Sequence, residues 1–180
     1  MLDPAPGMLL VATFALLFAS AAWQKARVRS EFTAVFVAYR VLPTALARRV
    51  AWVVPLVEIA IAASLLWDPS RRAAAVAGIA VLLAYACGVA LNLARGRRDL
   101  DCGCAGPGQR RPIAGWMVWR NVLLAAALAV AALPWAPRTL VATDALTITG
   151  GLAVAVLLYM TLDRLLGQVM PRAAALRGGR

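Results

Sequence analysis

Residues 73–93 read AAAVAGIAVLLAYACGVALNL and contain no charged side chain. A helix of roughly 20 apolar residues is long enough to cross the hydrocarbon core of a membrane. The whole chain agrees with that interpretation, since 63% of its 180 residues are hydrophobic and its mean hydropathy is +0.77. A soluble domain has about 45–50% apolar residues and could not bury so much apolar surface at this size. The composition therefore indicates a small integral membrane protein and excludes a soluble enzyme or a disordered chain.

Four further apolar runs are predicted to span the membrane. They cover about residues 6–23, 50–67, 113–133 and 145–162, and the last is the weakest because threonine and glycine dilute it. The first is expected to be a retained span rather than a signal peptide, because its positive charges follow the apolar run. Residues 1–167 are thus expected to form one all-α membrane domain, a polytopic bundle of four core transmembrane helices plus a fifth. A basic tail would follow at 168–180.

Two polar segments connect these spans. Segment 24–49 carries Phe32, Phe36 and Tyr39 at helical spacing among basic residues, which predicts an interfacial amphipathic helix ending at Pro43. Segment 95–112 is rich in glycine, proline and arginine, so it is expected to be a loop.

The charge of the chain is strongly positive, with nineteen Lys and Arg against eight Asp and Glu. The basic residues stand between long apolar runs, so anionic lipid and membrane topology explain them better than nucleic acid does. With five spans, sixteen of the nineteen fall on one side, in segment 24–49, in the 95–120 region and in the tail. The positive-inside rule then predicts an outside amino terminus and a cytoplasmic loop 95–112 in a bacterial cell membrane.

The chain has no histidine and three cysteines, at positions 87, 102 and 104. Without imidazole there is no histidine metal site, general base or catalytic pair. Cys102 and Cys104 flank Gly103 and follow Asp101, so the two thiols can cycle between dithiol and an easily reduced disulfide. Two thiolates could instead hold Cu(I), or the pair could be chemically inert. Cys87 is expected to pack as a small buried side chain, with a role as a resolving thiol as the functional alternative.

Glu58 is an acid deep inside an apolar span, which makes it a candidate functional residue. It lies about 12 Å along its helix from the basic side, and Arg120 lies about 10 Å along the span that begins near residue 113. These matching depths predict a Glu58–Arg120 pair, or a polar cluster that includes Asn121 and Asn92. Such a cluster would act as a clamp between helices or as a proton or electron relay.

Several motifs occur in an order that resembles a known family. They are Lys25, Phe32, Val35, Tyr39-Arg40-Val41-Leu42-Pro43, Pro55, Glu58, Asn92-Leu93-Ala94-Arg95-Gly96-Arg97, Asp101-Cys102-Gly103-Cys104 and Arg120-Asn121. Over about residues 8–135 the chain resembles the methylamine utilisation protein MauE family, relatives of the DoxX-like membrane proteins. It departs from the family pattern at Ala105, where phenylalanine is usual, and this departure leaves both thiols in place.

The resemblance implies a multi-pass membrane protein that supports maturation of methylamine dehydrogenase. The small subunit of that enzyme carries many disulfides and a tryptophan-derived quinone, so the subunit is the implied client and a thioredoxin-like protein the implied redox partner. A membrane quinone is a further candidate electron carrier. A client that folds outside the cytoplasm conflicts with the cytoplasmic loop that the arginine count predicts.

Three functions are therefore compatible with the sequence. The first is a thiol–disulfide redox accessory, with oxidoreductase activity at Cys102 and Cys104. The second is Cu(I) handling or transport of a small solute, with Glu58 and Arg120 in the path, although no inverted repeat of the kind found in transporters is evident. The third is a membrane assembly factor without catalytic activity.

Overall fold

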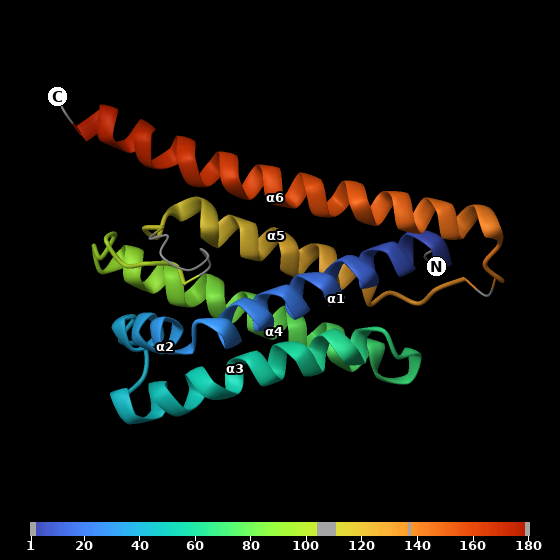
Figure 1. Ribbon diagram of the computed structural model, residues 1–180, viewed down its shortest axis with the longest axis horizontal. Coiled ribbons are helices and arrows are strands. Elements are labelled where there is room, and N and C mark those ends of the chain that lie inside the picture. Colours follow the sequence, from blue (N-terminus) through green and yellow to red (C-terminus); the bar gives the residue numbers. More distant parts are fainter. Residues whose placement is uncertain (1–2, 104–110, 137, 179–180) are drawn as a thin grey trace.

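The computed structural model describes residues 3–103, 111–136 and 138–178, with side chains as far as residue 166. It is built from helices (Figure 1). They are α1 (Pro4–Arg27), α2 (Arg29–Ala38), α3 (Thr44–Leu65), the short 3-10 helix η1 (Asp68–Ser70), α4 (Arg71–Ala94), α5 (Gly115–Ala131) and α6 (Ala142–Gly178). No strand occurs in this part of the chain, and Asp101 and Pro112 form one isolated bridge.

Three helices are long and apolar enough to cross a membrane, namely Pro4–Arg27, the continuous segment Asp68–Ala94, and Ala142–Leu166. The helix Gly115–Ala131 is apolar but shorter. α3 is 22 residues long and includes Arg48, Arg49 and Glu58 within its apolar sequence. The prediction of an all-α protein with membrane-length helices is therefore confirmed, whereas five complete crossings stay a prediction.

The main buried cluster lies between α1, α3, α4 and α5. It consists of Val11, Phe14, Phe18, Ile61, Ala62, Leu65, Ala74, Ala75, Leu82, Ala125, Leu128 and Ala131. Many of these side chains are alanine, because small residues let helices approach closely in a membrane protein. A second, smaller cluster of Val89, Ile113 and Met117 lies where α4 ends and α5 begins.

Segment 24–49 differs from its prediction as one amphipathic helix ending at Pro43. α1 continues through Arg27, so Lys25 belongs to the first long helix. α2 ends at Ala38, and Arg40 takes the left-handed conformation with φ 49°, which cannot continue a right-handed helix. Pro43 instead stands at the N-cap of α3.

The basic segments gather at one end of the bundle. α2, the start of α3, the end of α4 and the carboxyl terminus all lie at the left of Figure 1, whereas the amino terminus lies at the right. This arrangement matches the predicted charge asymmetry. Which end faces the cytoplasm stays a prediction.

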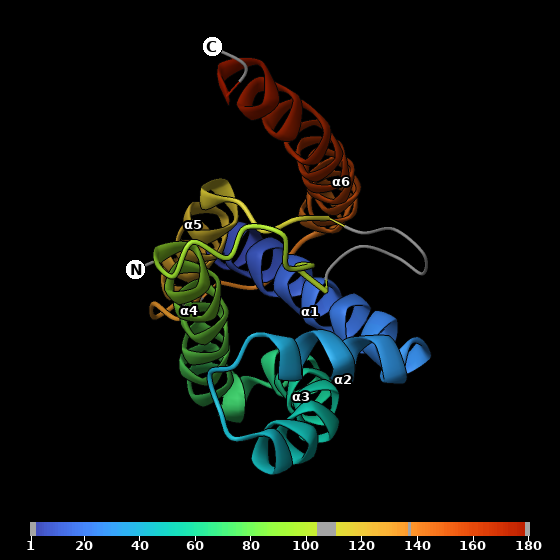
Figure 2. The same cartoon turned by 90° about the vertical axis from the view of Figure 1, so that its left-hand side faces the viewer.

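α6 lies along α1 on the side away from α3 (Figure 2). None of the residues in its apolar window is buried. Ionic contacts hold it at its amino-terminal end and at Asp163. At the amino-terminal end, the Arg138 guanidinium bonds the carboxylates of Asp3 and Asp144 at 3.0 and 2.7 Å. The hydrogen bond from Arg138 keeps the pKa of Asp3 below its usual value.

Candidate functional site

The base of the cysteine loop is closed by two backbone hydrogen bonds. The Cys102 amide donates to the Arg111 carbonyl at 2.9 Å, and the Ile113 amide donates to the Leu100 carbonyl at 2.9 Å. These bonds bring residues 100–102 beside residues 111–113, where α5 is about to begin. The loop is thus pinned on both sides of the cysteine pair.

Asp101 stabilises this loop through its carboxylate. Its Oδ1 accepts hydrogen bonds from the Gly103 amide at 3.1 Å and from the Arg111 amide at 3.4 Å. A short acidic side chain that bonds the backbone two residues later is a common way to fix a turn. Asp101 therefore fixes the backbone of the loop, and its supporting role in thiol chemistry stays a prediction.

The three cysteines stand in different settings. Cys102 is half-buried and packs against the smaller cluster around Val89, Ile113 and Met117. Cys87 is exposed on α4, so the expectation that it packs inside the bundle is wrong. Cys104 lies outside the described residues, and the predictions for it remain untested.

Arginine side chains fasten the end of α2 to the end of α4. Arg97 donates to the Ala38 carbonyl at 2.8 Å and to Asn92 Oδ1 at 2.9 Å, and Arg95 donates to the Arg40 carbonyl at 3.1 Å. A basic group at the carboxyl end of a helix satisfies carbonyls that lack a partner in the helix. Asn92 is fully buried and also donates to the Gly88 carbonyl at 3.0 Å. The Tyr39-Arg40 and Asn92–Arg97 motifs thus meet in space.

An ionic cluster ties the end of the cysteine loop that precedes α5 to α6. The Asp163 carboxylate bonds Arg111 at 2.6 Å and Arg120 at 2.5 Å. All three side chains are about one fifth exposed, with values of 18–21%. The Arg111 carbonyl also accepts a hydrogen bond from the Cys102 amide, so this cluster holds the part of the loop that lies beside Cys102.

The predicted pair of Glu58 with Arg120 is wrong. Glu58, 1% exposed, bonds Lys25 Nζ and also accepts the Tyr85 hydroxyl at 2.7 Å. Lys25 Nζ lies 3.3 Å from the same hydroxyl. Arg120 bonds Asp163 instead. The charged residue inside the second predicted span therefore pairs with α1 and α4, not with α5.

Asn121 and Asn92 do not join Glu58 either. The buried Asn121 amide donates to the Met117 carbonyl at 2.9 Å, one turn back in its own helix. For Asn121 the reason is the order of packing, since α3 packs against α1, α2 and α4, whereas α5 packs against α4 and α1. Asn92 is on α4, but it bonds Gly88 and Arg97 near the end of that helix. Equal depth along two helices does not place their side chains together unless the helices are neighbours. Lys25 was missed because the predicted span ended at residue 23, one turn too early.

Phe32 of α2 links the cysteine loop to the buried charged cluster. Gly103 lies against α2, where a Cβ added to it would stand 3.3 Å from Val35 Cγ1 and 3.8 Å from Phe32 Cδ2. The Lys25 ammonium lies 5.6 Å from the centre of the Phe32 ring. One aromatic ring thus stands between the loop backbone and the Lys25–Glu58–Tyr85 cluster.

Replacing Gly103 with alanine should destabilise the protein by about 1–2 kcal/mol, the cost of a left-handed residue that has a Cβ. Gly103 has φ +67°, and the new methyl group would press on Val35. The measurement is denaturant unfolding of the full chain in detergent. Gly115→Ala is the matched control, because nothing lies within 4 Å of a Cβ at that position. Equal stability of both variants would contradict the assigned loop geometry.

The described residues offer one thiol to a metal at this site. Among them, no three His, Cys, Asp or Glu side chains gather as metal ligands would. What the arrangement does provide is a half-buried thiol on a rigidly supported turn, at the basic end of a helical membrane protein.

Comparison with known proteins agrees with the motifs that meet at this end of the bundle. The family model described as "Methylamine utilisation protein MauE" matches residues 4–136. The methylamine utilization protein MauE of Paracoccus denitrificans is 42% identical over 155 residues, which cover 85% of this chain and 83% of that protein. The protein of the same name from Paracoccus versutus is 37% identical, with 91% and 90% covered.

A third relative, the methylamine utilization protein MauE of Methylophilus methylotrophus, is 33% identical over 171 residues, covering 92% of this chain and 88% of that protein. No solved structure matches the chain. The resemblance inferred from the sequence motifs is therefore confirmed, and the chain belongs to the MauE family of methylamine utilisation proteins.

Proposed function

We propose that this MauE-family protein is a membrane thiol–disulfide redox accessory that serves maturation of methylamine dehydrogenase. The observation that supports the proposal most directly is that hydrogen bonds and an ion pair hold the loop around Cys102 in place. Backbone bonds close the base of its loop and the Asp101 carboxylate fixes the turn. Arg97 links the ends of α2 and α4, and Asp163 pairs with Arg111 beside the loop. An exchange reaction needs a thiol held at a defined and partly accessible position.

In the proposed reaction, the thiolate of one loop cysteine attacks a sulfur of a partner disulfide. A new S–S bond forms between the proteins, the partner's own S–S bond breaks, and its second sulfur leaves as a thiolate that takes up a proton. The other loop cysteine, after losing its proton, then attacks the mixed disulfide and releases the partner as a dithiol. The loop becomes a Cys102–Cys104 disulfide and the partner gains two electrons. The reverse sequence oxidises the partner.

A thioredoxin-like protein and the small subunit of methylamine dehydrogenase are the partners in this proposal, with a membrane quinone as a further carrier class. The names of the relatives support the pathway, since each is called a methylamine utilization protein. We further propose that the loop faces the cytoplasm, because the basic segments lie together at its end of the bundle.

The test is to trap the mixed disulfide. Cys104→Ser removes the second thiol, so a covalent adduct between Cys102 and its partner should accumulate and disappear on reduction. Non-reducing electrophoresis of membranes from cells that produce the variant shows it, and mass spectrometry identifies the partner. Cys87→Ser is the control, since Cys87 is exposed on α4 and should form no part of the exchange.

Two results would overturn the redox role. One is normal maturation of methylamine dehydrogenase in cells that carry Cys102→Ser/Cys104→Ser, since a non-catalytic assembly factor behaves in that way. The other is Cu(I) bound to the purified protein and lost in the same double variant, which would favour metal handling. Sidedness is measured in the Cys87→Ser background with a membrane-impermeant thiol reagent, and labelling in intact cells would refute a cytoplasmic loop.

A further inference from the structure

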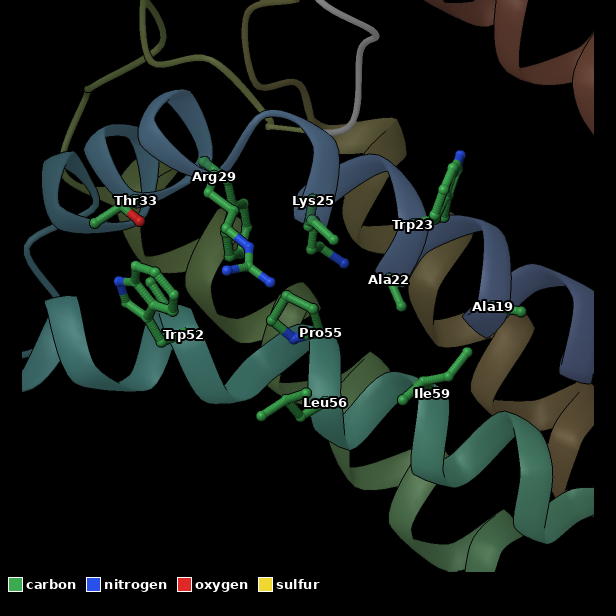
Figure 3. Close-up of a pocket in the computed structure, with 13 residues that line it drawn as sticks. Ala19, Ala22, Trp23, Lys25, Arg29, Thr33, Trp52, Pro55, Leu56 and Ile59 are labelled. Atoms are coloured by element: carbon green, nitrogen blue, oxygen red, sulfur yellow. The ribbon is translucent and has the colours of Figure 1, made fainter.

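A groove runs between α1, α2 and α3, on the side of the bundle away from α6 (Figure 3). One part of it has a volume of about 490 Å³ and is lined by Ala19 and Ala22 of α1 and by Pro55, Leu56 and Ile59 of α3. A second hollow of about 570 Å³ shares Ala26, Arg29, Thr33 and Trp52 with it and adds Arg27 and Ser30. The two hollows therefore form one continuous groove.

The sequence explains why the groove is open. Ala19, Ala22 and Ala26 recur at helical spacing, so they form a stripe of small side chains along α1. Pro55, Leu56 and Ile59 form the opposite wall at the same spacing. A wall of alanines leaves space that larger side chains would fill.

The polarity of the groove changes along its length. The part toward the middle of α1 is lined by alanine and aliphatic residues, whereas the part toward the basic end is lined by Arg27, Arg29, Ser30 and Thr33. None of the described residues that line either hollow is acidic. The groove is thus amphipathic, with an apolar trough and a cationic head.

The two arginines at the head are available to an anion. The Arg29 guanidinium lies 4.8 Å from the Trp52 ring centre, and that of Arg27 lies 5.5 Å from the Trp23 ring centre. Neither forms an ion pair with an acidic side chain in the described part of the chain, unlike Lys25, whose charge Glu58 balances. Figure 3 shows Lys25 and Arg29 reaching from the α1–α2 side toward α3.

The groove opens on the outer surface of the bundle. Trp23 and Trp52 are 63% and 58% exposed at its rim, and Leu56 is 64% exposed in its wall. α1 is a membrane-length helix, so this surface meets lipid. Tryptophan and arginine on such a surface are typical of the boundary between headgroups and acyl chains.

We propose that this groove binds a phospholipid that has an anionic headgroup. The phosphate and its negative charge lie at Arg27 and Arg29, and one acyl chain lies along the alanines of α1 and the Leu56–Ile59 wall of α3. The positive charge at the head of the groove favours an anionic phospholipid over the neutral amphipathic molecules of a membrane. A quinone would fill the apolar part and its carbonyl oxygens could accept hydrogen bonds, but it carries no negative charge to balance two arginines that have no acidic partner among the described residues. This site does not depend on the redox role of the cysteines.

The experiment measures binding of fluorescent phosphatidylglycerol to the purified full-length protein in a neutral detergent, with phosphatidylcholine as the uncharged comparison. Each cation near a membrane surface contributes about 1 kcal/mol to attraction of anionic lipid, or about fivefold in affinity. Arg27→Gln/Arg29→Gln should therefore weaken phosphatidylglycerol binding about 25-fold. The matched control is Arg98→Gln/Arg164→Gln, which removes the same charge from exposed sites on other elements at that end, and it should change binding less than about twofold.

A second variant tests the apolar part of the groove without changing charge. Ala26→Leu places a larger side chain where the two hollows join, and it should weaken phosphatidylglycerol binding while the melting temperature stays within a few degrees. Equal binding of phosphatidylglycerol by the wild-type protein and the Arg27→Gln/Arg29→Gln variant would overturn the proposal. So would equal affinity for phosphatidylcholine, or displacement of the bound lipid by an equimolar short-chain quinone.

Discussion

Replacing Lys25 with methionine should lower the free energy of unfolding by about 3–5 kcal/mol, the cost of leaving a buried charge without its partner. Glu58 is 1% exposed, and its carboxylate has Lys25 and Tyr85 as hydrogen-bond partners. Methionine keeps most of the volume of the lysine stem and removes the charge. Denaturant unfolding of the full chain in detergent measures the loss.

A double-mutant cycle separates the ion pair from simple packing. Lys25→Met/Glu58→Gln removes both charges and leaves a neutral side chain that can still accept from Tyr85, so most of the lost stability should return. Arg49→Met is the surface control, because Arg49 is exposed on α3, and it should change stability by less than about 0.5 kcal/mol. Additive losses in the double variant would contradict the pairing.

Asp163→Asn should destabilise the protein by about 2–3 kcal/mol, because two arginines would lose one shared counter-charge. The expected loss is smaller than that for Lys25, since the side chains of Arg111, Arg120 and Asp163 keep about a fifth of their surface exposed. The same substitution should speed alkylation of Cys102, because the Arg111 backbone accepts the Cys102 amide bond.

Two measurements check this second prediction. One is the free energy of unfolding in detergent, and the other is the rate at which a maleimide reagent labels Cys102 in a Cys87→Ser/Cys104→Ser background. Asp99→Asn is the control, since Asp99 is an exposed acid in the same polar segment. Faster labelling in the control than in Asp163→Asn would show that local charge, rather than the clamp on Arg111, governs access to the thiol.

The positions of the long helices could be predicted from the sequence because apolar run length is a local property. Each predicted span lies largely within a helix, from the first at Pro4–Arg27 to the last at Ala142–Gly178. The non-helical segment around Cys102 was predicted for the same reason, since glycine, proline and charge interrupt the apolar pattern there. The Asp101 turn also follows from local chemistry, because its carboxylate needs only the next few amides.

The polar partners inside the bundle could not be predicted in this way. A pairing depends on which helices are neighbours and on how each is rotated about its axis, and neither follows from the depth of a residue in its span. Glu58 and Arg120 stand on α3 and α5, and the partners that they meet come from α1, α4 and α6. No sequence motif surrounds Asp163, so its pairing with Arg111 and Arg120 can be recognised only once the position of α6 is known.

The ionic contacts of α6, one near its start and one at Asp163, have a consequence for its sequence. Arg138 bonds Asp3 and Asp144 at the amino-terminal end, Asp163 bonds Arg111 and Arg120 further along, and the apolar window of the helix has no buried residue. A helix held by ionic contacts at two points makes few demands on the shape of the side chains that face away from α1, so those positions need only to remain helical and apolar. Apolar substitutions between Asp144 and Asp163 are therefore expected to be tolerated where the side chain faces lipid, whereas a larger residue at Gly151 would press on α1, because a Cβ there would stand 2.8 Å from the Leu9 side chain.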